Sequence, residues 1–229
     1  MILRLSYLVS LRVFLITVVL ATAQQPKADV ALRNLEITQC TENEITTWGD
    51  GKDQKVSTAA LKFFYRHDGV PAWLQHSTVF ELVKKSVNAW SKCGIPSTPG
   101  LHYSGFRMTP ETILIAWNAS RSFGYFGLAD LSQHQLYLGA EAFHELNRRN
   151  PANDHIDTLQ MVLSHEMGHF YGLMAHSRRC VDVLSYYHDG RGGECQTRYP
   201  HLLKKFPEYR SSLPTTCDIQ RCKKLNNKP

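Results

Sequence analysis

Residues 165–176 read H-E-M-G-H-F-Y-G-L-M-A-H, and this stretch decides how the rest of the chain is interpreted. An α-helix turns by about 100° per residue, so residues four apart lie on the same face. His165 and His169 can therefore direct two imidazole nitrogens at one point. Glu166 lies beside the first histidine, where its carboxylate can reach a metal-bound water without being a ligand. This pattern indicates a metal site on a helix.

The residues that follow supply a third ligand. Gly172 can take the left-handed conformation that ends a helix, and the chain can then turn back to bring His176 to the same ion. Three histidines leave one of the four positions around zinc open, which distinguishes a catalytic zinc site from a closed structural one. We therefore expect zinc, Zn(2+), as the cofactor, held by His165, His169 and His176. Glu166 would be the general base.

The helix that carries this site has a second, apolar side. Asp154 or Asp157 can cap its start, and we expect it to run to Tyr171. His165 lies two residues from both Leu163 and Met167, a rotation of about 200°. The metal ligands and the core-facing side chains thus point in opposite directions. We expect the core side to comprise Ile156, Leu159, Leu163, Met167 and Phe170.

The stretch resembles the metzincin metallopeptidases, and among them the matrixin-like catalytic domains. Their pattern is H-E-x-x-H-x-x-G-x-x-H, followed by a turn that contains a methionine. Here Ala175 stands where the third histidine of the family should be, so His176 arrives one residue late. The segment 181–187, V-D-V-L-S-Y-Y, resembles the methionine turn, with Leu184 in the methionine's place. Leucine and methionine have similar volumes, so this exchange should cost less than about 1.5 kcal/mol of stability.

The resemblance also implies how substrate is handled. An extended peptide would pair with an edge strand in residues 122–139 by main-chain hydrogen bonds, which implies an endopeptidase. Tyr186 would stabilise the oxyanion, as a tyrosine at this offset does in astacin-like and serralysin-like metzincins. Matrixins carry a structural zinc and calcium near His134, but a ligand-rich loop is missing from this chain. We therefore interpret His134 as a surface residue.

The resemblance implies an α+β, metzincin-like fold. We expect a twisted, mostly parallel sheet of about four to five strands, with an edge strand over the cleft. An N-terminal helix, a central zinc-site helix and a C-terminal helix would surround it. The strands are expected at 60–66, 101–107, 112–117 and 133–138. Helices are expected at 79–90, where Trp90 is a core residue, and at 213–225, with 141–149 a short helix or loop.

The chain divides into four segments. Residues 1–23 read as a signal peptide with a basic start, an apolar core and an A-T-A cleavage site, so we expect a secreted, extracellular protein. The apolar run is too short for a membrane span, and no stable anchor is expected after cleavage. Residues 24–57 are either a pinned strand and loop or a short propeptide. Residues 58–226 form the catalytic domain, and 227–229 a tail.

Six cysteines in a secreted chain predict three disulfides. We expect Cys40 to pair with Cys93. Cys217 and Cys222 are five apart on an expected helix, too far apart to bond to each other. They should therefore pair with Cys180 and Cys195, unless the helix begins after Cys217, when Cys180–Cys195 and Cys217–Cys222 would form. A less favoured alternative is that a Cys40 or Cys93 thiolate caps the zinc and keeps the enzyme latent.

Composition limits the partners. The net charge is +6, from 26 basic and 20 acidic residues, with no basic cluster interleaved with aromatic residues. We therefore expect no nucleic-acid partner. The expected partner is a peptide or protein substrate bound as an extended strand, and we expect a monomer. Asn118 begins a glycosylation sequon, N-A-S.

Two other functions compete with a secreted zinc metalloendopeptidase. In the first, a distant carboxylate is the third ligand, as in thermolysin-like enzymes, and Glu194 or Glu208 would supply it. In the second, the late histidine and the lost methionine mark a catalytically degenerate metzincin-like domain that binds a protein partner without cleaving it. Metal content and a protein-cleavage assay separate these possibilities.

Overall fold

The computed structural model describes residues 27–122, 124–150 and 154–228. The expected signal segment, 1–23, lies outside these residues. Within the described part, no helix has both the length and the apolar character needed to cross a membrane. Three disulfides join the six cysteines, and such bonds persist in the oxidising environment outside the cytosol.

A five-stranded, mostly parallel sheet forms one layer of this α+β fold. Four strands run parallel, and the fifth, β4, is antiparallel to β5 at one edge. The central strand is fully buried and matches the predicted range 112–117. The strands are ordered β2 (Ser97–Leu101), β1 (Leu61–Tyr65), β3 (Thr112–Trp117), β5 (Gln135–Leu138) and β4 (Gly127–Asp130).

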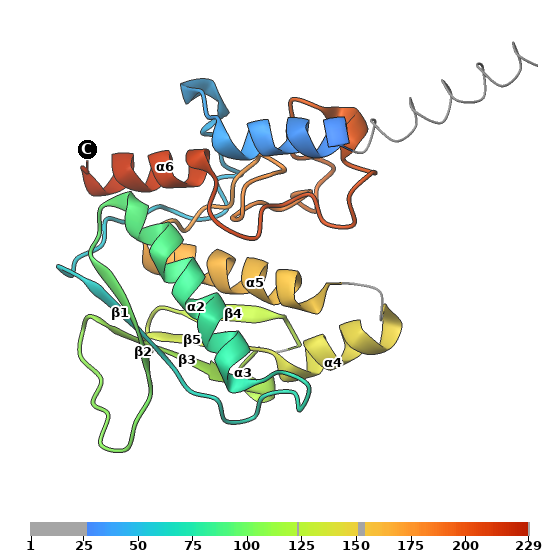
Figure 1. Cartoon of the computed structure of the whole chain (residues 1–229). Coiled ribbons are helices and arrows are strands. Elements are labelled where there is room, and N and C mark those ends of the chain that lie inside the picture. The colour runs from blue at the N-terminus through green and yellow to red at the C-terminus, as the bar shows by residue number, and fades with distance from the viewer. Residues whose placement is uncertain (1–26, 123, 151–153, 229) are drawn as a thin grey trace, which may run out of the picture.

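Helices form the other layers. Figure 1 shows α2 and α5 next to the sheet, with α6 and the helix over 27–38 beyond them. The helices labelled in Figure 1 are α2 (His76–Trp90), α3 (Ala119–Ser122), α4 (Ala140–Arg149), α5 (His155–Phe170) and α6 (Thr216–Asn226). Single turns of 3₁₀-helix occur at Glu42–Glu44, Ser91–Cys93 and Pro200–Leu202.

The main core lies where α2 crosses α5. Trp90 is fully buried, as predicted, and its indole N–H donates to the carbonyl oxygen of Ser164 at 2.8 Å. The ring of Trp90 also stacks on Tyr171, with centroids 5.3 Å apart. Gly168 makes this close approach possible, because a Cβ there would lie 2.9 Å from Trp90 and 3.0 Å from Leu184. The helix that carries the histidines therefore packs tightly against Trp90 and Leu184.

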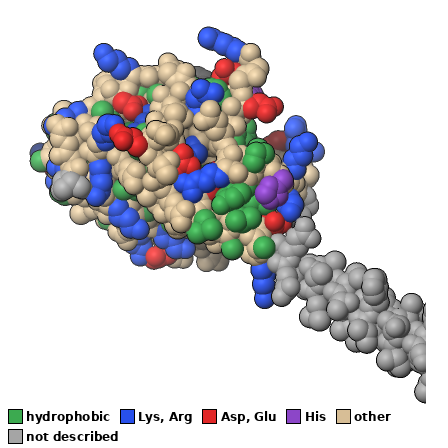
Figure 2. Space-filling view, turned by 90° about the horizontal axis from the view of Figure 1, so that it is seen from above, with side chains coloured by type: hydrophobic (Ala, Val, Ile, Leu, Met, Phe, Trp, Pro, Cys, Tyr) green, Lys and Arg blue, Asp and Glu red, His purple; other side chains and the backbone are tan. Residues whose placement is uncertain are grey.

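The outer helix over 27–38 is held by a smaller core. Its partly buried Leu32 and Ile37 pack against Leu202 and Tyr209. Figure 2 looks down on this side of the molecule and shows basic and acidic side chains spread over it, together with a group of exposed hydrophobic side chains. Val30 and Leu35 of the helix are 48% and 42% exposed. Sequence reasoning missed this helix, because its polar and mixed composition was interpreted as a strand and loop.

The disulfide pairing differs from the predicted one. Cys40 bonds to Cys217, not to Cys93, and Cys93 bonds to Cys222. Cys180 bonds to Cys195, as only the alternative pairing proposed. Cys217 and Cys222 both lie in α6 and do not bond to each other, as their spacing predicted. They point to different sides of α6, and each ties it to a different part of the chain. With all six cysteines bonded, none offers a thiolate to cap a metal.

Two predicted elements and one predicted core residue are corrected. The strand expected at 101–107 is mostly loop, because β2 ends at Leu101 and Gly105 takes a left-handed φ of 85°. Ile156 is 37% exposed and does not belong to the core side of α5. The last helix begins at Thr216 rather than near Pro214, because Thr215 caps it and accepts the backbone N–H of Asp218.

Candidate metal centre

Helix α5 presents the first two histidines, and its ends are well defined. Asp154 is the N-cap: its side chain accepts the backbone N–H groups of Ile156 and Asp157 at 3.0 and 2.9 Å. At the other end, Gly172 has a left-handed φ of 93°, as predicted. A Cβ at Gly172 would lie 2.0 Å from the carbonyl oxygen of Gln54. The chain can turn sharply at this position only with glycine.

The turn brings the late histidine to the first two. The ring centroids of His165, His169 and His176 lie 5.1 to 5.3 Å from one another. Each ring offers one ligand nitrogen, and these nitrogens lie within 4.8 Å of one another. The structure therefore assembles a group that could hold a metal ion from the three predicted residues.

Each ring is oriented by a bond to its Nδ1 atom. His165 Nδ1 lies 2.8 Å from the carbonyl oxygen of Val183, and His169 Nδ1 lies 2.8 Å from that of Leu173. His176 Nδ1 lies 2.7 Å from the carboxylate of Asp50. Because each oxygen accepts a hydrogen bond from Nδ1–H, the Nε2 atoms carry the free lone pairs. Ligand histidines in metal sites are commonly oriented in this way.

The donor set fits zinc. The Nε2 atom of His176 is buried and has no hydrogen-bond partner among the described residues, which is costly unless a ligand is bound there. Neutral imidazole is a preferred zinc ligand. Burial lowers the pKa of all three histidines, that of His169 to about 4, so the rings are neutral at pH 7.

Glu166 lies beside the three histidines in a half-buried position, where it lines the same cleft. Burial raises the pKa of its carboxyl group to about 7, and a hydrogen bond from the backbone N–H of Ala129 opposes part of this rise. A Cβ at Gly127 would lie 2.7 Å from Glu166 Cγ, so β4 packs directly on this side chain. A carboxyl group with a pKa near 7 is suited to accept and release a proton.

The floor of the site is the turn that resembles the methionine turn. Leu184 is fully buried, and its carbonyl oxygen accepts the backbone N–H of Ser177 at 2.8 Å. The backbone N–H of Val183 donates to Asp218 at 3.0 Å. The C-terminal helix therefore fixes the turn whose Val183 carbonyl orients His165.

Comparisons with known proteins leave the family open. No family model and no curated protein matches the chain. A solved structure described as "GM1 bound form of the ECX AB5 holotoxin" aligns with 82% of this chain and 92% of its own, at 14% identity and a TM-score of 0.49. A likeness at this level carries no argument about fold or function.

A cleft runs past the histidines beneath the edge strand. Its walls come from β4, α5 and the loops that follow them, and Tyr186 lies at one side, 44% exposed. The expected edge strand over the cleft is therefore β4. His134 lies in the turn between β4 and β5 and is not part of the metal-binding group. The cleft is lined by Tyr125, Gly127, Leu128, Ala129, Leu131, His165, Glu166, His169, Met174, His176 and Tyr186.

The carboxylates considered as distant ligands lie elsewhere. Glu208 forms an ion pair with Arg210 at 2.7 Å and accepts the hydroxyl of Tyr187. Glu194 is exposed, next to a β-bridge with His188. Neither carboxylate is in the group that the three histidines form, so the thermolysin-like ligand set is not supported.

Sequence reasoning missed two acidic residues next to the site. Asp50 contacts His176 directly, and Asp53 accepts the backbone N–H groups of Met174 and Ala175. Both lie more than 120 positions before their partners, and nothing in the spacing of residues connects the two segments. The only local signal is D-G-K-D at 50–53, which indicates a turn and says nothing about a metal.

Proposed function

We propose that this protein is a secreted zinc metalloendopeptidase of the metzincin type, which hydrolyses internal peptide bonds of protein substrates. One observation carries the proposal. Three histidines converge, each with Nδ1 already bonded to an oxygen, while the buried carboxyl group of Glu166 lies next to them. A closed structural site would need a fourth protein ligand.

The metal would be held by His165, His169 and His176. When bound, zinc supplies a Lewis acid for the peptide carbonyl and lowers the pKa of a bound water to about 7. The chain's own contribution is to keep the three rings neutral by burial and to fix their orientation through oxygen atoms. The metal affinity of such a site falls as the pH falls, because protons compete for the same nitrogens.

Glu166 would act as general base and then as general acid. In the ionised form its carboxylate accepts a proton from the attacking water. In the protonated form it gives that proton to the leaving amine. Because burial raises the pKa of Glu166 to about 7, both the ionised and the protonated forms are populated near neutral pH. This role needs no contact between Glu166 and the metal.

Tyr186 would stabilise the oxyanion. Burial is the largest cause of the raised pKa of its phenol, with the negative charges of Glu166 and Asp50 next. The hydroxyl therefore stays protonated and able to donate a hydrogen bond to a developing negative charge. Its ring lies at the mouth of the cleft beside the histidines.

The substrate would bind as an extended strand along β4. This strand is the last in the sheet order, so one of its edges has no strand partner among the described residues. Main-chain pairing there would place a peptide bond over the histidines with little demand on side chains. That geometry favours an endopeptidase over an enzyme that trims chain ends.

Two measurements on the purified secreted protein test the proposal. Metal analysis should find one zinc per chain, and a denatured-protein substrate such as casein should be cleaved internally. A zinc chelator should stop cleavage, and added zinc should restore it. A zinc-loaded protein that cleaves nothing would support the degenerate, partner-binding alternative instead.

A further inference from the structure

The N-terminal segment lies along the loop that carries the third histidine. Residues 46–54, here called the clasp, pair with the loop 172–178. The backbone N–H of Gln54 donates to the carbonyl oxygen of Gly172 at 2.9 Å, at one end of the contact. At the other end, the backbone N–H of Arg178 donates to the carbonyl oxygen of Thr46 at 3.0 Å. The loop is therefore held along its whole length.

His176 receives most of these contacts. One carboxylate oxygen of Asp50 accepts the backbone N–H of His176 at 2.9 Å, and the other accepts Nδ1–H at 2.7 Å. The backbone N–H of Trp48 donates to the carbonyl oxygen of His176 at 3.0 Å. Every polar group of His176 is thus occupied by the clasp except Nε2, the atom directed at the metal.

The clasp also accommodates the extra residue that makes the histidine late. Met174 and Ala175 donate their backbone N–H groups to one oxygen of Asp53, at 2.9 and 3.0 Å. Arg221 of α6 pairs with Asp53 at 2.6 Å and donates to the carbonyl oxygen of Ala175 at 2.6 Å. Without these partners the lengthened loop would leave backbone groups unpaired, which is unfavourable in a buried loop.

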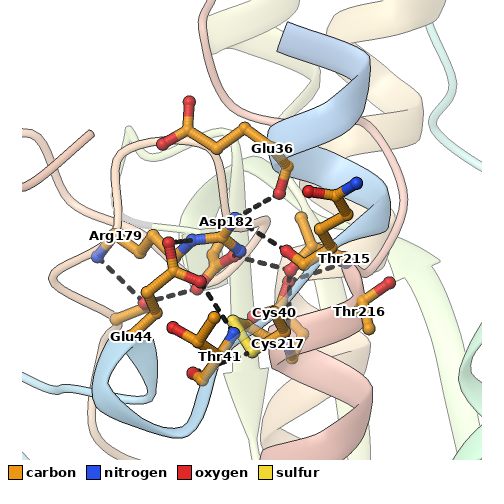
Figure 3. The surroundings of a disulfide bond; sticks show 12 residues. Glu36, Cys40, Thr41, Glu44, Arg179, Asp182, Thr215, Thr216 and Cys217 are labelled. Atoms are coloured by element: carbon orange, nitrogen blue, oxygen red, sulfur yellow. Dashed lines mark hydrogen bonds and ion pairs between the residues drawn. A yellow bond between two sulfur atoms is a disulfide. The ribbon is translucent and has the colours of Figure 1, made fainter. Parts of the chain in front are cut away.

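A disulfide fixes the chain just before the clasp. Figure 3 shows Cys40 bonded to Cys217 at the start of α6, surrounded by polar side chains. Arg179, which follows the histidine loop, donates to the main-chain oxygens of Glu36 and Gln39, and pairs with Asp182 at 3.0 Å. The N-terminal segment is therefore joined to α6 by the disulfide, and to the residue that follows the histidine loop by Arg179.

We propose that the clasp is a working part of the metal centre and stays with the active protein. Asp50 is a positioning residue: it fixes the ring of His176 and the tautomer whose Nε2 faces the metal. Asp53 shapes the loop that brings the ring there. Residues 46–54 are then not a removable propeptide. This inference rests on the proposed function, because it takes zinc as the metal.

The test compares zinc affinity in Asp50→Asn and the wild type, by competition with a chromophoric chelator. The asparagine keeps the size and can still accept the backbone N–H, but it presents an N–H₂ group to Nδ1. That group favours the tautomer with a proton on Nε2. We expect zinc affinity to fall by about 10- to 100-fold. The thermal midpoint of the metal-free protein should change little, which separates positioning from a purely structural role.

Asp189→Asn is the matched control. Asp189 lines the same pocket as Asp50 but bonds to Gly193 and Arg191, not to a histidine. This variant removes the same charge and should keep wild-type zinc affinity. Equal zinc affinity in Asp50→Asn and the wild type would overturn the positioning role and leave the proposed function standing. A wild type that binds no zinc would contradict the proposed function itself.

A second measurement needs no variant. The intact mass of the zinc-loaded, active protein secreted by its host should include residues 46–54. An active form that begins after residue 57 and has lost this segment would overturn the proposal.

Discussion

The ring of Tyr186 lies against the ring of His176, with centroids 3.8 Å apart and planes inclined by 19°. The stack places the phenol beside one of the three converging histidines and at the side of the cleft. The His176 ring is therefore held by two residues: Tyr186 packs on its face, and Asp50 hydrogen-bonds to its Nδ1 edge. The ring and the hydroxyl of Tyr186 therefore have separable roles.

Tyr186→Phe should keep the stack and remove only the hydroxyl. We expect kcat to fall by about 100- to 1,000-fold, the range for loss of one oxyanion donor, with zinc affinity unchanged. Tyr187→Phe is the control, because the Tyr187 hydroxyl bonds to Glu208 and to the backbone N–H of Tyr209, away from the histidines. Peptidase kinetics and chelator competition check both variants. Full activity in Tyr186→Phe would remove the hydroxyl from the proposed chemistry.

Glu166→Ala should abolish cleavage and leave zinc bound. The carboxyl group is proposed as proton carrier, a role that contributes about 10²–10⁴-fold to rate, and it is not a ligand. Glu166→Gln, which keeps the side-chain volume beneath Gly127, should behave alike. Asp157→Asn, on the exposed first turn of the same helix, should retain activity. If zinc-loaded Glu166→Ala cleaves casein at the wild-type rate, the proposed mechanism is wrong.

Gly172→Ala should destabilise the protein strongly. The residue has a left-handed φ of 93°, and its added Cβ would lie 2.0 Å from the carbonyl oxygen of Gln54. We expect a loss of at least about 2 kcal/mol in the free energy of unfolding. Gly190→Ala is the control, since Gly190 has a similar φ of 72° with open space around it. Urea denaturation measures both, and equal losses would mean that the contact with the clasp is not tight.

Stability of the metal-free protein should fall as the pH falls from about 6.5 to 4. Burial depresses the pKa of the metal-binding histidines, that of His169 from 6.5 to about 4. In this window the unfolded chain therefore binds more protons than the folded one, and unfolding becomes easier as the pH drops. His169 alone accounts for up to about 3 kcal/mol. Urea titrations with a chelator present, at several pH values, should show a shallower slope for His169→Asn. Stability that is flat over this range would contradict the buried, neutral state of the ring.

Local patterns were sufficient to predict the three histidines that the fold brings together as a group that could hold a metal ion. The four-residue spacing of His165 and His169 and the left-handed turn at Gly172 predicted the grouping, and the late His176 joins it. The buried strand over 112–117 and the core position of Trp90 followed from hydrophobicity and period alone. These signals are local, since each depends on residues within one element.

Contacts between distant segments could not be predicted in this way. The pairing of Cys40 with Cys217 depends on helix 27–38 lying beside α6. Both helices are polar, so their sequences carry no hydrophobic period that would predict how they pack on each other. The carboxylate of Asp50 reaches His176 across 126 positions. Ile156 fits the apolar period of α5 but lies at the first turn, beyond the edge of the core.

A crystal structure of the zinc-loaded protein, with anomalous data at the zinc edge, tests the central claim most directly. We predict a single ion about 2.0–2.1 Å from the Nε2 atoms of His165, His169 and His176, with no fourth protein ligand. An ion bound without His176, or no ion between the three rings, would contradict it.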